Sequence, residues 1–132
     1  MDAILLDTNV FLFLLKGDAR AQPYASRLWG RRLALSFMTV AELSQWAAMR
    51  HWDQPRIDQL GESLQACVIL PFDVALCRLW GEIRAQRRAG DHPISPQDAW
   101  IAATALQYHL PLVTHDPQAF RAVPGLDLIS TA

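Results

Sequence analysis

The chain has 132 residues, of which 52% are hydrophobic and 19% charged, and its net charge is −1. These values are typical of one folded domain with a substantial core and argue against a disordered chain. The N-terminus lacks the basic region and cleavage site of a secretory signal, and the longest apolar stretch, residues 10–15, is too short to span a bilayer. We therefore expect one cytoplasmic domain over residues 1–132, with no membrane segment.

Short apolar runs alternate with helical segments along the whole chain. We predict strands at residues 3–6, 33–36, 67–70, 112–114 and 126–129. Helices are predicted over residues 9–15, 23–32, 39–50, from Pro55, 73–88, 95–109 and from Pro117. This alternation predicts an α/β fold in which helices cover a parallel sheet. Ligands of such a sheet bind beyond the carboxyl ends of its strands.

Four acidic residues are predicted to lie at that edge. Asp7 directly follows the first strand, and Asp116 comes just after the strand LVT. Glu42 stands three residues after Thr39, and Asp98 three residues after Ser95, so both are predicted to lie in the first turn of a helix. Helices that follow parallel strands begin where the strands end, so all four acids belong to one side of the fold.

Each acid taken alone also has a structural interpretation. Thr39 to Glu42 fits a capping box, and Ser95 to Asp98 fits nearly as well, with Pro96 at the first helical position. Asp116 before Pro117 fits a helix cap, and Asp7 fits a turn in which its carboxylate accepts from local amides. Spacing alone does not decide between these caps and a shared site.

If the topology joins the four acids, their like charges raise one another's pKa and destabilise the fold. A hard divalent cation relieves that repulsion, and Mg²⁺ prefers carboxylate oxygens, water and phosphate. Such a site activates water and neutralises charge on a phosphate under attack. Thr8, Asn9 and Thr114 stand beside the acids and are expected to orient a carboxylate or a bound water, although Asn9 equally suits a helix cap.

Other features point to partners with less force. Arg84, Arg87 and Arg88 end the long helix and are candidates to guide RNA, or they form an ordinary solvated face. The helix at residues 10–15 is apolar nearly all round, so it must be buried in its own core or under a second subunit or another protein. Cys67 and Cys77 have no metal-ligand spacing, and we expect both to be buried, reduced thiols.

Four segments resemble the motifs of PIN-domain ribonucleases. ILLDTNVFLFLL is similar to the first motif, TVAEL to the second, PISPQDAWIAATAL to the third and LVTHDPQAF to the fourth. The size and spacing most resemble VapC-type toxins of bacterial toxin–antitoxin pairs. The resemblance implies a three-layer α/β/α fold with a short central parallel sheet, Mg²⁺ or Mn²⁺ dependence, endonucleolytic RNA cleavage, a cognate antitoxin and a homodimer.

The same resemblance implies the roles of the acids. Asp7, Glu42 and Asp98 would be the core metal ligands and catalytic residues, and Asp116 would complete the pocket. Many members carry another polar or acidic residue shortly before the final Phe, whereas here Ala119 precedes Phe120, so the fourth motif offers one acid only. We therefore expect one tightly bound ion.

Three other functions compete with the toxin. A housekeeping RNA-processing nuclease without an antitoxin would use the same acids, and a PIN module without catalysis would bind RNA or protein. A receiver domain also gathers acids around Mg²⁺, but it needs a late lysine, and the only lysine is Lys16.

Overall fold

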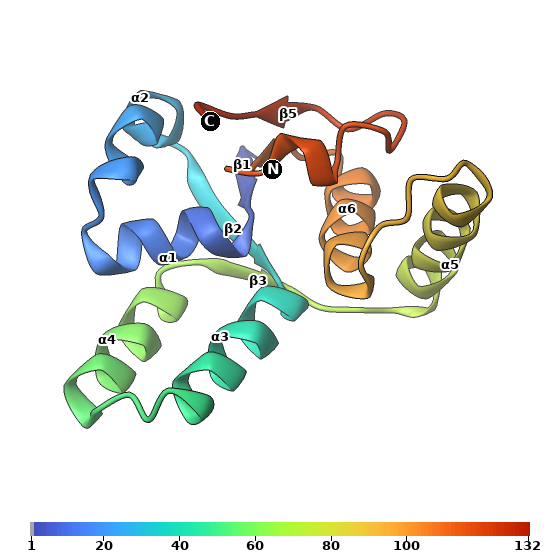
Figure 1. The fold of residues 1–132 in the computed structure, drawn as a ribbon. Helices are drawn as coiled ribbons and strands as arrows, with labels where there is room; N and C mark the ends of the chain where they lie inside the picture. The colour runs from blue at the N-terminus through green and yellow to red at the C-terminus, as the bar shows by residue number, and fades with distance from the viewer. Residues whose placement is uncertain (1) are drawn as a thin grey trace.

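The computed structural model describes residues 2–132, and its centre is a five-stranded parallel sheet (Figure 1). The strands, in the spatial order β3-β2-β1-β4-β5, are β3 (Val68–Leu70), β2 (Arg32–Ser36), β1 (Ala3–Leu6), β4 (Leu112–Val113) and β5 (Leu128–Ile129). All four neighbouring pairs run parallel. The first strand of the chain is therefore the central strand of the sheet.

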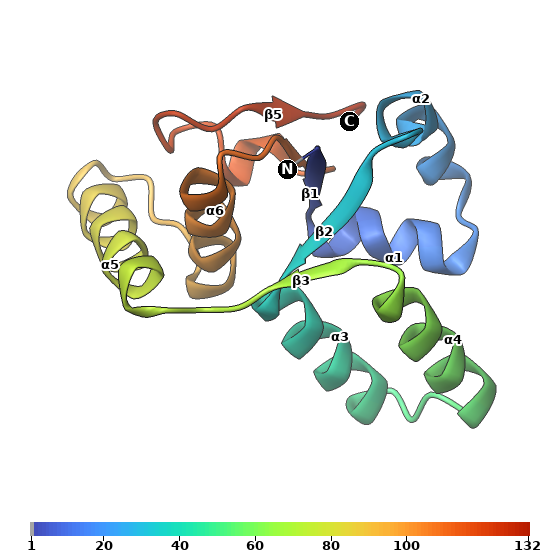
Figure 2. The ribbon, with the colours of Figure 1, turned by 180° about the vertical axis from the view of Figure 1, so that it is seen from behind.

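Helices cover both faces of this sheet. They are α1 (Thr8–Lys16), α2 (Ala25–Leu28), α3 (Phe37–Met49), α4 (Gln54–Gln65), α5 (Val74–Ala89) and α6 (Pro96–Tyr108), with 3₁₀ turns η1 (Ala19–Tyr24) and η2 (Pro117–Ala119). The view from behind in Figure 2 shows α5 and α6 side by side. No helix within residues 2–132 is both long and apolar enough to cross a membrane.

Strand β1 shows why there are three layers. Its four residues are all buried, and successive side chains point to opposite faces. Ala3 and Leu5 belong to the core that contains residues of α5 and α6. Ile4 and Leu6 belong to the core that contains residues of α1, α3 and α4. A strand buried on both sides reads as an unbroken apolar run, and AILL is such a run.

The helix predicted over residues 23–32 is wrong. That segment instead holds the end of η1 and the one-turn helix α2, which stops at Leu28. Trp29 is extended and Gly30 has a φ of 74°, a value that favours glycine and ends the helix. Arg32 then pairs with Ala3 as the first residue of β2, so sheet pairing overrides the local helical signal.

Two further sequence predictions need correction. Helix α3 begins at Phe37 and not at Thr39, because the Ser36 hydroxyl caps it by accepting a hydrogen bond of 3.1 Å from the Met38 amide. Cys77 is exposed and Cys67 is half-buried, so neither thiol is fully enclosed. Cys77 lies on the outer side of α5, where the apolar pattern alone does not separate a buried from a solvent-facing position.

Candidate metal centre

Asp7 occupies the loop where β1 ends and α1 begins. Its side chain is 6% exposed, and its Oδ1 accepts from the Thr8 amide at 2.8 Å. Its Oδ2 accepts from the Thr114 hydroxyl at 2.7 Å. Burial is the largest cause of a raised pKa at Asp7, and the charge of Asp116 adds to it, while these two hydrogen bonds oppose the rise. Asp7 therefore caps a helix and also presents a crowded carboxylate.

Glu42 lies in the second turn of α3, not in the first, because the helix starts earlier than predicted. The capping box expected from Thr39 is therefore absent. The Thr8 hydroxyl donates to Glu42 Oε1 at 2.9 Å and lies 2.9 Å from the Thr39 hydroxyl. Since Thr8 has one hydroxyl proton and gives it to Glu42, Thr39 must be the donor to Thr8. Burial, followed by the charges of Asp7 and Asp98, raises the pKa of Glu42.

Asp98 lies in the first turn of α6, as predicted. The Ser95 hydroxyl caps the helix by accepting from the Asp98 amide at 3.0 Å, and Pro96 opens the first turn. The cap uses the backbone of Asp98 and leaves its carboxylate available. Burial and the charges of Asp7 and Asp116 raise the pKa of Asp98 to about 6.

Asp116 follows β4 and is exposed. It stands at the start of η2, but its side chain makes no capping hydrogen bond, so the cap interpretation is wrong. Its amide donates to the Thr114 hydroxyl at 3.0 Å, the same hydroxyl that donates to Asp7. Thr114 therefore joins the two loops that carry Asp7 and Asp116.

The four acids share one negative field, and no basic side chain among residues 2–132 forms an ion pair with any of them. Each of Asp7, Glu42 and Asp98 has its pKa raised by the charge of at least one other member of the set. The ion pairs found within residues 2–132 join Arg20 to Asp18 and Arg31 to Asp2, and neither involves the four acids. An oxygen-only donor set with unrelieved negative charge fits a hard cation such as Mg²⁺.

These side chains do not form a ready coordination shell. Among residues 2–132, no three His, Cys, Asp or Glu side chains lie close enough together to hold one ion as they stand. The carboxylates of Asp7 and Glu42 are instead held by hydrogen bonds to Thr8 and Thr114. The fit therefore rests on donor chemistry and charge.

The remaining predicted residues divide into two groups. Thr8 and Thr114 contact the acids, whereas Asn9 is exposed and makes no comparable contact. Arg84 donates to the Ile94 carbonyl and Arg87 to the Ala122 carbonyl at 3.4 Å, while Arg88 is exposed.

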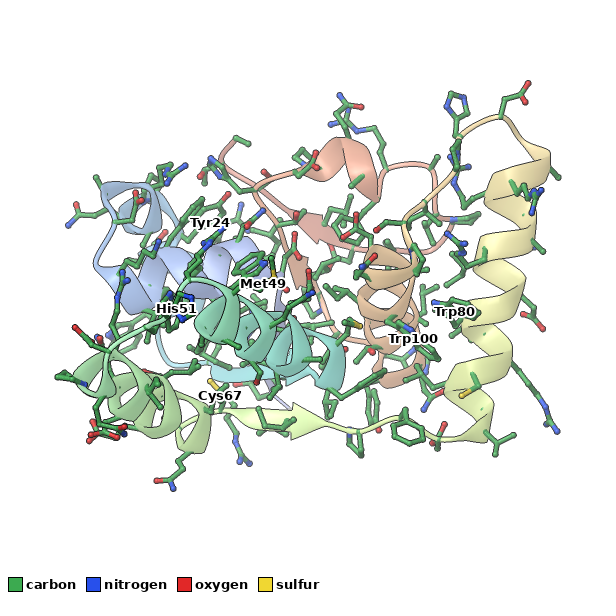
Figure 3. The ribbon with its side chains drawn as sticks, turned by 60° about the horizontal axis from the view of Figure 1, so that its bottom comes forward. Tyr24, Met49, His51, Cys67, Trp80 and Trp100 are labelled. Carbon is green, nitrogen blue, oxygen red and sulfur yellow. The ribbon has the colours of Figure 1, made fainter. Side chains whose placement is uncertain are left out.

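Sequence reasoning missed two polar residues near the acids. Thr39 was interpreted as a helix cap, although it bonds Thr8. Tyr24 is fully buried, and its hydroxyl lies 2.6 Å from His115 Nδ1 and accepts from the Thr131 amide at 3.2 Å (Figure 3 labels Tyr24). The His115 ring packs edge-on against Phe13 and Tyr24. In the sequence, the only signal for Tyr24 was that an aromatic residue stands in an otherwise polar segment.

A sequence profile described as PIN domain matches residues 4–126. The chain belongs to the PIN-domain family. Among its relatives, VapC ribonuclease Y4jK of Sinorhizobium fredii is 36% identical over 96% of each chain. The PIN-domain motifs identified in the sequence thus fall within a match that covers nearly the whole chain.

Solved structures of other proteins share the fold of this chain. The structure of VapBC-5 from Mycobacterium tuberculosis, described as a member of the VapBC family of toxin–antitoxin systems, matches with a TM-score of 0.68 and 26% identity over 98% of each chain. VapBC2 from Rickettsia felis, solved bound to a DNA fragment from its promoter, matches with a TM-score of 0.85 and 22% identity over 97% of this chain and 98% of that one. The predicted α/β/α fold with a central parallel sheet is therefore confirmed.

Proposed function

We propose that this PIN-domain protein is a Mg²⁺-dependent RNA endonuclease and the toxin of a VapBC-type toxin–antitoxin pair. The observation that carries the proposal is the group Asp7, Glu42, Asp98 and Asp116, whose charges act on one another at one edge of the sheet with no basic partner among residues 2–132. Relatives that carry the name VapC ribonuclease support RNA as the substrate.

The chain's own residues would each have a defined task. Asp7, Glu42, Asp98 and Asp116 would hold the ion, with Mn²⁺ able to replace Mg²⁺. Thr114 and Thr8 would keep Asp7 and Glu42 ionised and oriented by donating hydrogen bonds to them. When bound, the cation would activate water for attack on a phosphodiester and offset charge on the phosphate. The lone acid of the fourth motif favours one tightly bound ion.

A cognate antitoxin and a homodimer are part of the proposal. The support for the antitoxin comes from solved relatives described as toxin–antitoxin systems. The apolar helix at residues 10–15 does not require such a partner, since Val10, Phe11, Leu12 and Phe13 are buried in the chain's own core. Light scattering of the purified protein would test the dimer.

The proposal is tested by cleavage of a mixed RNA pool with Mg²⁺, with Mn²⁺ and with EDTA. We expect Asp98→Asn to lose cleavage by at least tenfold, because a core ligand is removed without altering the Ser95 cap. Asp127→Asn is a matched control, since Asp127 is exposed and directly precedes β5, at the amino ends of the strands and away from the carboxyl ends that carry the acids. Equal cleavage by Asp98→Asn and wild type, or full activity in EDTA, would refute the assignment.

The toxin role needs a test in cells. Induced expression of the wild-type chain in a bacterial host should arrest growth, and Asp98→Asn should relieve the arrest at equal protein level. Cleavage in vitro without growth arrest would favour a housekeeping nuclease instead. Folded protein that binds RNA but never cuts it would favour a PIN module without catalysis.

A further inference from the structure

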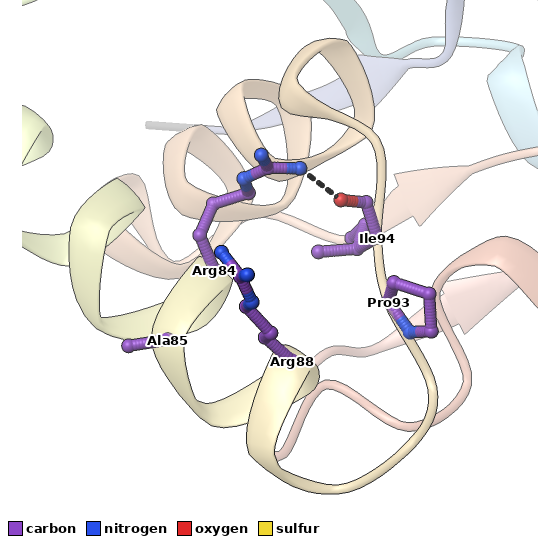
Figure 4. A pocket seen from close by; sticks show the side chains of 5 residues that line it. All are labelled: Arg84, Ala85, Arg88, Pro93 and Ile94. Carbon is purple, nitrogen blue, oxygen red and sulfur yellow. Dashed lines mark hydrogen bonds between the residues drawn. The ribbon is translucent and has the colours of Figure 1, made fainter.

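Two side chains of α5 hold the segment that leads into α6. Trp80 Nε1 donates to the Pro96 carbonyl at 3.0 Å, and Arg84 Nη1 donates to the Ile94 carbonyl, as Figure 4 shows. Ser95, the residue between these two carbonyls, caps α6 by accepting from the Asp98 amide. The cap of α6 is therefore bracketed by hydrogen bonds from a neighbouring helix.

The donors themselves are held in place by stacking. The Trp80 ring stacks on Trp100 with centroids 4.9 Å apart and an interplanar angle of 18°, and both are labelled in Figure 3. The Arg84 guanidinium lies over the Trp80 ring, with its Cζ 5.7 Å from the ring centroid. Trp100 is two residues beyond Asp98. Side chains of α5 therefore contact residues both before Asp98, at 94 and 96, and after it, at Trp100.

The opposite end of the helix pair is also tied. The Gln107 amide near the end of α6 donates to both oxygens of Asp73, at 3.3 and 3.2 Å, and Asp73 caps α5. The two helices are thus fixed relative to each other at both ends. The connection between them is exposed at residues 90–93, and its His92 amide donates back to the Arg87 carbonyl at 3.2 Å.

Arg84 is half-buried and does not pair with any acid among residues 2–132. Its neighbour Arg88 is exposed and lines the same open hollow, of about 490 Å³, with Pro93 and Ile94. Of the five N–H donors on its guanidinium, Arg84 commits one to the Ile94 carbonyl, whereas the exposed Arg88 remains open to phosphate.

We propose that Trp80 and Arg84 are positioning residues that place the Asp98 carboxylate by fixing the start of α6. This inference rests on the proposed function, because it takes Asp98 as a metal ligand. A site that holds an ion and substrate in register loses much of its rate when one ligand moves by about an ångström. The two donors hold the backbone carbonyls of residues 94 and 96. They thereby fix the position and orientation of the first turn of α6, which bears Asp98.

The test uses Arg84→Met, which keeps an unbranched apolar side chain but removes the guanidinium and its donor, and Trp80→Phe, which keeps a ring against Trp100 but removes the N–H. We expect Mn²⁺ affinity, measured without RNA, to fall about tenfold in each variant. We also expect faster hydrogen exchange at the Asp98 amide and a lower kcat at unchanged KM. Arg84→Lys should recover most of the affinity, and Arg78→Met, on an exposed part of α5, should match wild type.

Two results would overturn the inference. One is unchanged Mn²⁺ affinity and unchanged Asp98 exchange in both variants. The other is a raised KM with weaker salt dependence, shared by Arg84→Met and Arg88→Met, which would make Arg84 a phosphate contact. Failure of the nuclease assignment has a different signature: Asp98→Asn itself would then leave Mn²⁺ binding and cleavage intact. The exchange rate of the Asp98 amide shows in either case whether Trp80 and Arg84 fix the start of α6.

Discussion

The Thr8 hydroxyl donates to Glu42 across 34 residues of sequence, from the first turn of α1 to the second turn of α3. This bond lowers the pKa of Glu42 against the effect of burial. The Thr8 oxygen also serves as the acceptor for the hydroxyl of the fully buried Thr39.

Replacing Thr8 with Val should therefore weaken both the fold and ion binding. We expect the free energy of unfolding to fall by about 1–2 kcal/mol, because the Thr39 hydroxyl is left buried without an acceptor. Mn²⁺ affinity should fall as well, since the pKa of Glu42 rises further. Urea unfolding and Mn²⁺ titration check this, with Thr8→Ser as a control that keeps the hydroxyl. A Thr8→Val protein indistinguishable from wild type would contradict the role of this bond.

The raised pKa of Asp98 predicts a pH-dependent stability of the metal-free protein. The pKa is about 6 in the folded state, against 3.8 for an ordinary aspartate. The folded state therefore holds the proton more tightly, so the stabilising contribution is complete below about pH 4. It is lost as the pH rises through about 6. The difference between these two pKa values corresponds to about 3 kcal/mol, which we reduce to about 1–2 kcal/mol because solvent screens this partly exposed group.

Unfolding in EDTA at a series of pH values measures this effect. Asp98→Asn should be more stable than wild type at pH 7 and equally stable at pH 4, because it removes crowded negative charge without disturbing the helix cap. Asp127→Asn should follow wild type throughout. A loss of stability in Asp98→Asn at pH 7 would mean that its carboxylate has a structural role.

Asp116 is expected to separate ion binding from stability. It is exposed and caps no helix, so Asp116→Asn should change the free energy of unfolding by less than about 0.5 kcal/mol. Cleavage should fall at low Mn²⁺ and recover when more Mn²⁺ is added, because a weaker ligand is lost while three remain. Activity that no concentration of Mn²⁺ restores would give Asp116 a direct part in the reaction.

The buried Tyr24 hydroxyl should matter for stability more than for chemistry. Tyr24→Phe removes a partner from both His115 Nδ1 and the Thr131 amide. We expect a loss of about 1–3 kcal/mol in unfolding free energy, since these polar groups lose a buried contact. The kcat of the remaining folded protein should change by less than about threefold. A much larger fall in kcat at intact stability would place His115 in the reaction.

The sequence predicted most where the signal is local. Asp98 was placed correctly because Ser95 and Pro96, both within three residues, define the start of α6. The position of Asp7 followed from the apolar strand just before it. In each case the neighbouring residues carry the information.

Prediction failed where two local signals competed and a distant contact decided between them. Ser36 and Thr39 both suit a helix cap, and Ser36 takes that position while Thr39 bonds Thr8, 31 residues away. Trp80 and Arg84 gave no sign that they hold Ile94 and Pro96, because a hydrogen bond to a backbone carbonyl leaves no mark in residue type. Spacing also gave no measure of how far apart the four carboxylates lie.

The bond between Thr114 and Asp7 joins residues 107 positions apart, and β1 needs β4 beside it to complete the centre of the sheet. A ribosome that has made only the first hundred or so residues therefore carries a chain with no finished pocket. Loop closure over such a distance is slow, so the acids meet after most of the chain has emerged. If these acids cut RNA, the nuclease site of a nascent chain is completed only after the segment that carries Thr114 and Asp116 has been made.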